Sequence, residues 1–104
     1  MTIKETIKLI AYLYYVNDHS ELNGYINELT MNEVYELYTA YKIGKTIEAG
    51  FNNGKVVKRF DRSKYFLKQR EFYKHSKSEK EIRNELKSKI GNYVDYFHVF
   101  VDYY

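Results

Sequence analysis

Residues 78–104 read SEKEIRNELKSKIGNYVDYFHVFVDYY. Ser78 and Glu81 have the spacing of a capping box, in which a Ser or Thr side chain and a Glu side chain each satisfy a free backbone amide at a helix start. The apolar residues that follow recur every three or four positions and form one stripe: Ile82, Leu86, Ile90, Tyr93, Phe97, Phe100 and Tyr104. This period predicts one amphipathic helix from Glu79 to near residue 104. A strand over 93–103 is the alternative, because nine of the twelve residues from Tyr93 on are aromatic or Val.

A second capping box precedes the segment 31–43. Thr30 and Glu33 have the required spacing, and the apolar residues after them again repeat with the period of a helix. Gly44 follows this segment, and glycine commonly ends helices in a left-handed conformation because it has no Cβ to clash. We therefore expect a helix over 31–43 that ends at Gly44.

The same signals predict further helices elsewhere in the chain. Thr2 and Glu5 open a helix over 2–16, and its broad apolar arc indicates burial on most sides. A short helix is expected over 21–29 and another over 63–75. With the two segments above, the chain has four to five helices.

The segment 46–60 carries a signal for strands. Asn52-Asn53-Gly54 lies between two short runs, and an Asn-Gly pair supplies the positive φ angles of a tight β-hairpin turn. The expected fold class is mainly α, in a single domain over 1–104, with a small β-hairpin at 46–60 as an open alternative. Three helices followed by a hairpin resemble a winged helix-turn-helix in the order of the elements. In that resemblance 31–43 is the recognition helix, where Glu33 and Glu36 would repel the major groove.

Composition narrows the class of protein and its compartment. The chain has 104 residues and 44% of them are hydrophobic, which is ordinary for a globular domain. It has no cysteine, so it has neither disulfides nor thiolate metal ligands, and we expect a cytoplasmic protein. Phe, Tyr, Met, Ile, Asn and Lys, which AT-rich codons encode, supply 50 of the 104 residues. Small phage and mobile-element proteins have this composition, and such a protein would act in the cytoplasm of its host cell.

Formal charge is distributed unevenly along the chain. Residues 1–50 carry −3, residues 51–77 carry +7 and residues 78–104 carry −1. Phosphate backbones attract a basic segment of this kind, because each neutralised phosphate releases condensed counterions. A solvated helix face and a contact for an acidic protein are the alternatives. The candidate nucleic-acid or partner-binding residues are Lys55, Lys58, Arg59, Arg62, Lys64, Lys68, Arg70 and Lys74.

A helical wheel of 63–75 predicts how this segment is oriented. The four aromatic residues fall on one side, opposite the basic ones, and are expected to pack inward: Tyr65, Phe66, Phe72 and Tyr73. Aromatic rings near lysines also stack on unpaired bases, which requires a flat ring and little else.

Tyrosine is the second functional signal. The chain has 13 tyrosines, more than a core of this size is expected to hide, and tyrosine is favoured at protein interfaces. The candidate interface residues are Tyr35, Tyr38, Tyr93, Phe97 and Tyr104. The long apolar stripe near the end of the chain also makes a homodimer an expected state.

Catalytic and metal motifs are missing from the sequence. His19, His75 and His98 do not have metal-ligand spacing, and the five glycines do not gather into a phosphate-binding loop. We therefore expect no enzyme, no metal and no cofactor. The first functional hypothesis is a non-enzymatic regulatory protein that binds nucleic acid or a nucleoprotein through 55–77. The alternative is an inhibitor of a host defence or nucleic-acid enzyme, of the anti-restriction or anti-CRISPR kind, that docks through tyrosine-rich surfaces.

Overall fold

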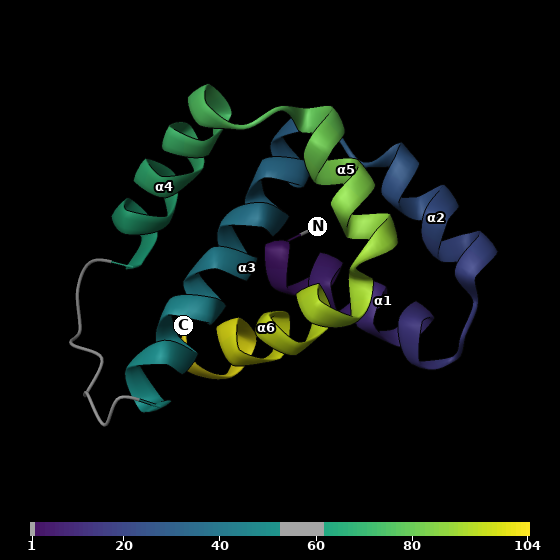
Figure 1. Ribbon diagram of the computed structural model, residues 1–104, viewed down its shortest axis with the longest axis horizontal. Helices are drawn as coiled ribbons and strands as arrows, with labels where there is room; N and C mark the ends of the chain where they lie inside the picture. The colour runs from purple at the N-terminus through teal and green to yellow at the C-terminus, as the bar shows by residue number, and fades with distance from the viewer. Residues whose placement is uncertain (1, 53–61) are drawn as a thin grey trace.

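The computed structural model of the chain describes residues 2–52 and 62–104 and shows an all-α fold. Within these residues there are helices and connecting turns but no strands. Figure 1 shows α3 through the middle of the molecule, α4 at one edge and α2 at the other. The helices are α1 (Ile3–Tyr15), α2 (His19–Glu28), α3 (Met31–Asn52), α4 (Arg62–Ser76), α5 (Glu79–Ser88) and α6 (Ile90–Tyr103).

The hydrophobic core lies where α6 crosses α3 and α1. Tyr93, Phe97 and Phe100 of α6 are among the largest side chains with almost no exposed surface, and α3 contributes Leu37 and α1 contributes Ile10 beside them. Burial of each such side chain contributes about 1.5–3 kcal/mol. The strand alternative for 93–103 is therefore wrong, because a helical period brings these rings to one buried face.

The caps confirm how the helices begin. Thr30 and Glu33 form a complete capping box: the Thr30 amide donates to Glu33 Oε1 at 2.9 Å, and the Glu33 amide donates to Thr30 Oγ1 at 3.2 Å. Thr2 and Ser78 likewise accept the amide of the third residue after them. The helix expected over 21–29 begins earlier, at His19, because Asp18 is its N-cap.

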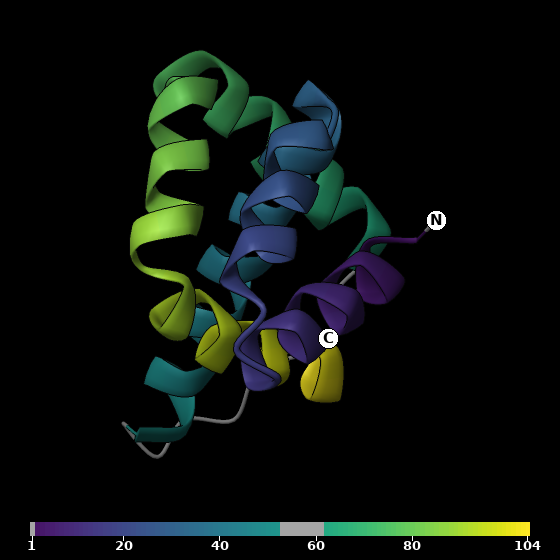
Figure 2. The same ribbon diagram turned by 90° about the vertical axis from the view of Figure 1, so that its right-hand side faces the viewer.

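A tight turn joins α1 to α2. Asn17 has a φ of 58°, in the left-handed region. The Asn17 amide donates to the Tyr14 carbonyl and the Asp18 amide to the Leu13 carbonyl, both at 3.1 Å, as in a Schellman motif. The turn folds α2 back beside α1, and Figure 2 shows α2 between α5 and α1.

The predicted end of the third helix at Gly44 is wrong. The helix continues to Asn52, so the first strand of the hairpin expected at 46–60 is helical and the winged-helix order is wrong as well. The rest of that hairpin, 53–60, lies outside the described residues. Gly44 is inside the helix for another reason: a Cβ there would overlap the Tyr96 carbonyl oxygen of α6. Glycine at this position lets two helix backbones touch.

The single helix predicted from Glu79 to the end of the chain is wrong too. Lys89, with φ −124° and ψ 32°, breaks it into α5 and α6. One straight helix of that length would extend for about 37 Å, nearly the longest extent of the molecule, which measures 39 × 30 × 23 Å. The break lets α5 pack on α2 and α3 while α6 packs on α1 and α3.

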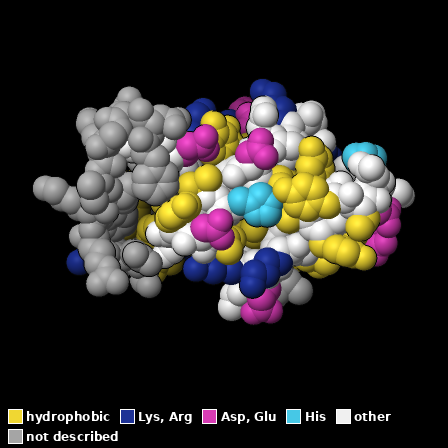
Figure 3. Space-filling view, turned by 90° about the horizontal axis from the view of Figure 1, so that it is seen from below, with side chains coloured by type: hydrophobic (Ala, Val, Ile, Leu, Met, Phe, Trp, Pro, Cys, Tyr) yellow, Lys and Arg dark blue, Asp and Glu magenta, His cyan; other side chains and the backbone are white. Residues whose placement is uncertain are grey.

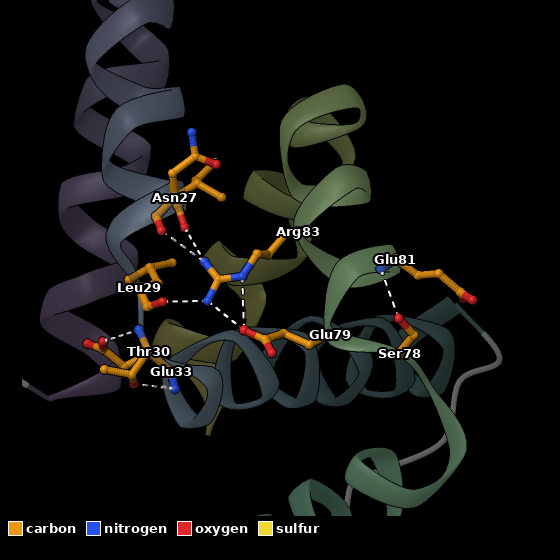
Figure 4. Close-up of polar contacts among 9 residues, drawn as sticks. Asn27, Leu29, Thr30, Glu33, Ser78, Glu79, Glu81 and Arg83 are labelled. Carbon is orange, nitrogen blue, oxygen red and sulfur yellow. Dashed lines mark hydrogen bonds and ion pairs between the residues drawn. The ribbon is translucent and has the colours of Figure 1, made fainter.

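An arginine connects α5 to the C-terminal end of α2. Arg83 donates through Nη1 to the Ile26 carbonyl at 2.7 Å and through Nη2 to the Leu29 carbonyl at 2.5 Å (Figure 4). Glu79, one turn earlier on α5, holds the guanidinium through Nε at 3.0 Å and Nη2 at 2.7 Å. The last carbonyls of a helix have no partner within it, so Arg83 adds donors at the end of α2, where the Leu29 amide donates to the Ile26 carbonyl over a longer distance, 3.4 Å.

No helix in the described part of the chain combines the length and apolar character needed to span a bilayer.

Candidate nucleic-acid interface

Helix α4 packs on the rest of the protein through one narrow side. Tyr73 meets the Tyr38 ring of α3 edge-on at 4.9 Å, and Phe66 lies 5.9 Å from the Phe100 ring of α6. Arg70, on the same side, pairs with Glu36 of α3 at 3.2 Å. The other sides of α4 face away from the core at the edge of the molecule (Figure 1).

The outer side of α4 combines cations with exposed apolar side chains. Lys64 and Lys68 are exposed, as is His75. Phe72 is 61% exposed and Leu67 49% exposed. The expectation that Phe72 packs inward with Tyr73 is wrong, because neighbouring residues are about 100° apart on a helix and the contact with α3 is too narrow to include both.

Two of the predicted binding residues are engaged within the protein. Arg70 pairs with Glu36 and Glu71, each at 3.2 Å, and Lys74 pairs with Glu71 at 3.4 Å. Hydrogen bonds from Lys74 and then Arg70 lower the pKa of the Glu71 carboxyl. Both basic side chains are only 20% exposed. Arg70 connects α4 to Glu36 of α3, whereas Lys74 pairs within α4, and both cations have carboxylate partners in the protein.

The remaining predicted cations divide into two groups. Lys55, Lys58 and Arg59 lie outside the described residues, and Arg62 is the first residue of α4. The structure therefore brings together Lys64 and Lys68, one helical turn apart, and adds Phe72 one turn further on the same side. The helical wheel of 63–75 placed Phe72 on the wrong side of the helix. The exposure of Phe72 depends on how α4 packs against α3, which the local sequence period does not predict.

Most of the predicted interface residues are in the core. Tyr35, Tyr38, Tyr93 and Phe97 are at most 5% exposed, and Tyr104 stacks on Phe100 at 5.0 Å. A partner could reach the first four only if the helices separated. Because the apolar stripe of α6 is used inside one copy of the chain, a homodimer would need other residues.

Different tyrosines are exposed, on the face formed by α1 and α6. Tyr12 and Tyr15 of α1 are 62% and 60% exposed, and Tyr103 of α6 is 58% exposed. Tyr15 is hydrogen-bonded to His98 Nε2 at 2.7 Å, with the two rings stacked at 5.8 Å. Figure 3 shows hydrophobic side chains, acidic side chains and histidine together on this face.

A half-buried ion pair lies where α4 turns into α5. Lys77 Nζ is 2.8 Å from Glu85 Oε1 and donates to the Tyr38 hydroxyl at 3.3 Å. The Tyr93 hydroxyl donates to the other Glu85 oxygen at 2.6 Å, and the Tyr35 hydroxyl donates to the Lys77 carbonyl at 2.6 Å. These bonds connect α3, α5 and α6 through Lys77 and Glu85.

The electrostatics of this pair keep both members charged. Burial disfavours the charge on Lys77, but hydrogen bonds to Glu85 and Tyr38 outweigh it, so the pKa of Lys77 is raised. Burial also disfavours the Glu85 charge, but hydrogen bonds from Lys77 and Tyr93 lower the pKa of Glu85. Burial and then the hydrogen bond to Glu85 raise the pKa of Tyr93. A lysine held protonated lacks the lone pair that a nucleophile or base needs, so the arrangement is suited to holding helices together.

We expect the variant Glu85→Gln to weaken the acid sensitivity of folding. The pKa of the Glu85 carboxyl is lower in the folded state than its ordinary value of 4.5. The ionised carboxyl therefore stabilises the folded state above pH 4.5, and this stabilisation is lost as the pH falls through the lower, folded-state pKa. Denaturant unfolding at about pH 6 and pH 3 should show a smaller loss of unfolding free energy for Glu85→Gln than for the unmodified chain. Glu81→Gln, at an exposed position on the same helix, should keep the original pH dependence. Equal pH dependence in all three proteins would contradict the role of the pair.

Within the described residues, no group of three or more His, Asp or Glu side chains is placed to hold a metal ion. A polar hollow of about 260 Å³ lies between α3 and α6, with Tyr41, Glu48 and Asp95 in its lining. A second hollow, of about 270 Å³, lies between α1 and α2.

Comparison of the chain with protein-family models, with curated proteins and with solved structures finds no match.

Proposed function

We propose that the protein is a non-enzymatic binding protein that engages nucleic acid, free or in a nucleoprotein, through the basic segment 55–77. The observation that carries this proposal is the outer side of α4, where a phenylalanine ring that is 61% exposed follows two exposed lysines at one-turn spacing. A large ring that is exposed to solvent is available to stack on an unpaired base. Lysines that pair with phosphates, next to a ring that stacks on a base, are the parts of a single-strand binding surface.

Charge distribution supports the same assignment. Residues 51–77 carry a formal charge of +7, whereas both flanking segments are negative. The ion pairs of Arg70 and Lys74 reduce the charge that α4 itself presents. Binding should therefore be moderate, electrostatic and weakly selective for sequence, and should favour unpaired strands over a duplex because the ring needs an open base.

The double variant Lys64→Glu/Lys68→Glu should weaken binding of an oligothymidine at low salt. Two lost phosphate contacts would reduce the slope of log affinity against log salt by about 1.4 for a single strand. Fluorescence anisotropy across a salt series measures this slope. The matched control is Lys4→Glu/Lys8→Glu, which places the same charge change at the same spacing on exposed positions of α1. Equal losses in both variants would mean that only net charge matters, and α4 would not be the site.

The variant Phe72→Ala tests stacking separately from charge. Loss of one base–ring contact should weaken oligothymidine binding roughly 5- to 150-fold, which corresponds to about 1–3 kcal/mol. The salt slope should not change, since no cation is removed. Tyr12→Ala removes an equally exposed ring on α1 and should leave binding intact. If Phe72→Ala binds normally, the ring has no part in nucleic-acid binding.

The second candidate function is an inhibitor that docks on a protein through tyrosines. The exposure of Tyr12 and Tyr15 favours it, because they are among the most exposed large hydrophobic side chains of the described residues. In the native host, Tyr12→Ala/Tyr15→Ala would then abolish biological activity while Lys64→Glu/Lys68→Glu would not. The reverse result would support the nucleic-acid function.

A further inference from the structure

Lysine and arginine are missing from a long part of the sequence. The chain has 17 of these residues, yet none lies between Lys8 and Lys42. This stretch forms most of α1, all of α2 and the first half of α3. It contains five carboxylates: Asp18, Glu21, Glu28, Glu33 and Glu36. In a basic protein, α2 and the helix segments on either side of it therefore carry only negative side-chain charges.

A hollow opens within this stretch, between α1 and α2. It measures about 270 Å³, and Leu9 and Leu13 of α1 supply its apolar part. On the α2 side it is lined by Glu21, Gly24, Tyr25 and Glu28, which lie at successive turns of one helix face. Figure 2 shows α1 and α2 next to each other, with α5 on the other side of α2.

The two carboxylates at the hollow are available to a ligand. Glu21 and Glu28 are exposed, and neither forms an ion pair with another residue in the described part of the chain. A Cβ at Gly24, between them, would meet nothing within 4 Å, so the space in front of the helix there is open. The hollow thus joins an apolar surface, an aromatic ring and two uncompensated negative charges.

We propose that this hollow binds a lysine or arginine side chain presented by a basic protein partner. The methylene stem of such a side chain would cover Leu9 and Leu13, as long basic side chains commonly cover apolar surface. Its charged end would lie near Glu21 and Glu28, with the Tyr25 ring offering a cation–π contact. Nucleic acid is repelled by the same carboxylates, so this site is separate from α4 and does not depend on the proposed nucleic-acid function.

The test uses the full chain and a synthetic amphipathic helical peptide with leucine on one side and arginine on the other. In a titration followed by amide NMR shifts, saturable changes should appear around Leu13, Gly24 and Tyr25. Glu21→Gln/Glu28→Gln should lower the affinity for the peptide about tenfold, which corresponds to about 1.4 kcal/mol. Gly24→Phe, whose side chain would fill the hollow, should lower the affinity for the peptide at least as much. Gly24→Ala should leave that affinity unchanged.

Matched controls separate the hollow from general electrostatic attraction. Asp95→Asn/Asp102→Asn removes two exposed carboxylates at the same seven-residue spacing on α6 and should leave peptide binding unchanged. Lys64→Glu/Lys68→Glu should also keep the affinity, so that failure of the nucleic-acid function would leave this result intact.

Five results would overturn the proposal. The first four are equal weakening by the α6 variant, normal binding by Gly24→Phe, equal binding of a peptide with glutamine in place of arginine, and a lack of saturable shifts at the hollow. Displacement of the peptide from these residues by an oligonucleotide would assign the hollow to nucleic acid and would overturn it as well.

Discussion

Replacing Gly44 with alanine is expected to lower the free energy of unfolding by about 3 kcal/mol, at the upper end of overpacking effects. The added Cβ would overlap the Tyr96 carbonyl and lie 3.4 Å from the Phe100 amide nitrogen. Both are backbone groups within α6, so no side-chain rotation relieves the contact. In an exposed helix the same substitution stabilises by about 1 kcal/mol. Urea unfolding monitored by circular dichroism measures the change.

The matched control for this prediction is Gly24→Ala. A Cβ at Gly24 meets nothing within 4 Å, so that variant should gain roughly 0.5–1 kcal/mol from helix propensity alone. The two glycine substitutions should therefore change stability in opposite directions. If Gly44→Ala also stabilises the protein, α3 and α6 do not approach as closely as the structure shows.

Replacing Arg83 with methionine should cost about 2–4 kcal/mol of unfolding free energy. Methionine keeps much of the apolar stem but removes the guanidinium that bonds to the Ile26 and Leu29 carbonyls and to Glu79. These carbonyls end α2, where a cation also interacts favourably with the helix dipole. Amide hydrogen exchange should show the last turn of α2 losing protection first. Thermal unfolding gives the size of the effect.

Two further variants show whether the forked geometry matters. Arg83→Lys keeps the charge but cannot reach several acceptors in one plane, so it should recover only part of the loss. Lys80→Met removes a cation from an exposed position on the same helix and should change stability by less than about 0.5 kcal/mol. A change in Arg83→Met as small as that in Lys80→Met would show that α2 does not need this cap.

Local signals in the sequence predicted where most helices begin. The N-caps at Thr2, Thr30 and Ser78 are each observed, with both bonds of the capping box at Thr30, since an N-cap involves only neighbouring residues. The helix expected over 63–75 is observed as Arg62–Ser76. These predictions held because the contacts that decide them lie within one turn.

The failures share one physical cause, which is contact between distant parts of the chain. Gly44 has the same local signature as a helix end, and only the approach of α6, about fifty residues later, explains why a glycine is needed inside this helix. The break at Lys89 depends on which helices α5 and α6 pack against. The pairing of Arg70 with Glu36 crosses 34 residues and removes one predicted binding residue from solvent.

The order of α1, α3 and α6 along the chain has a consequence for synthesis on the ribosome. Its rings complete the core against α1 and α3, so these two helices leave the exit tunnel long before the surface that covers them. Until then the apolar side of α3, including Leu37 and Ile43, has no permanent cover. Contacts between such distant segments form late and slow folding, and exposed apolar surface invites aggregation or chaperone binding. The nascent chain therefore exposes this apolar surface until α6 has followed α1 and α3 out of the ribosome.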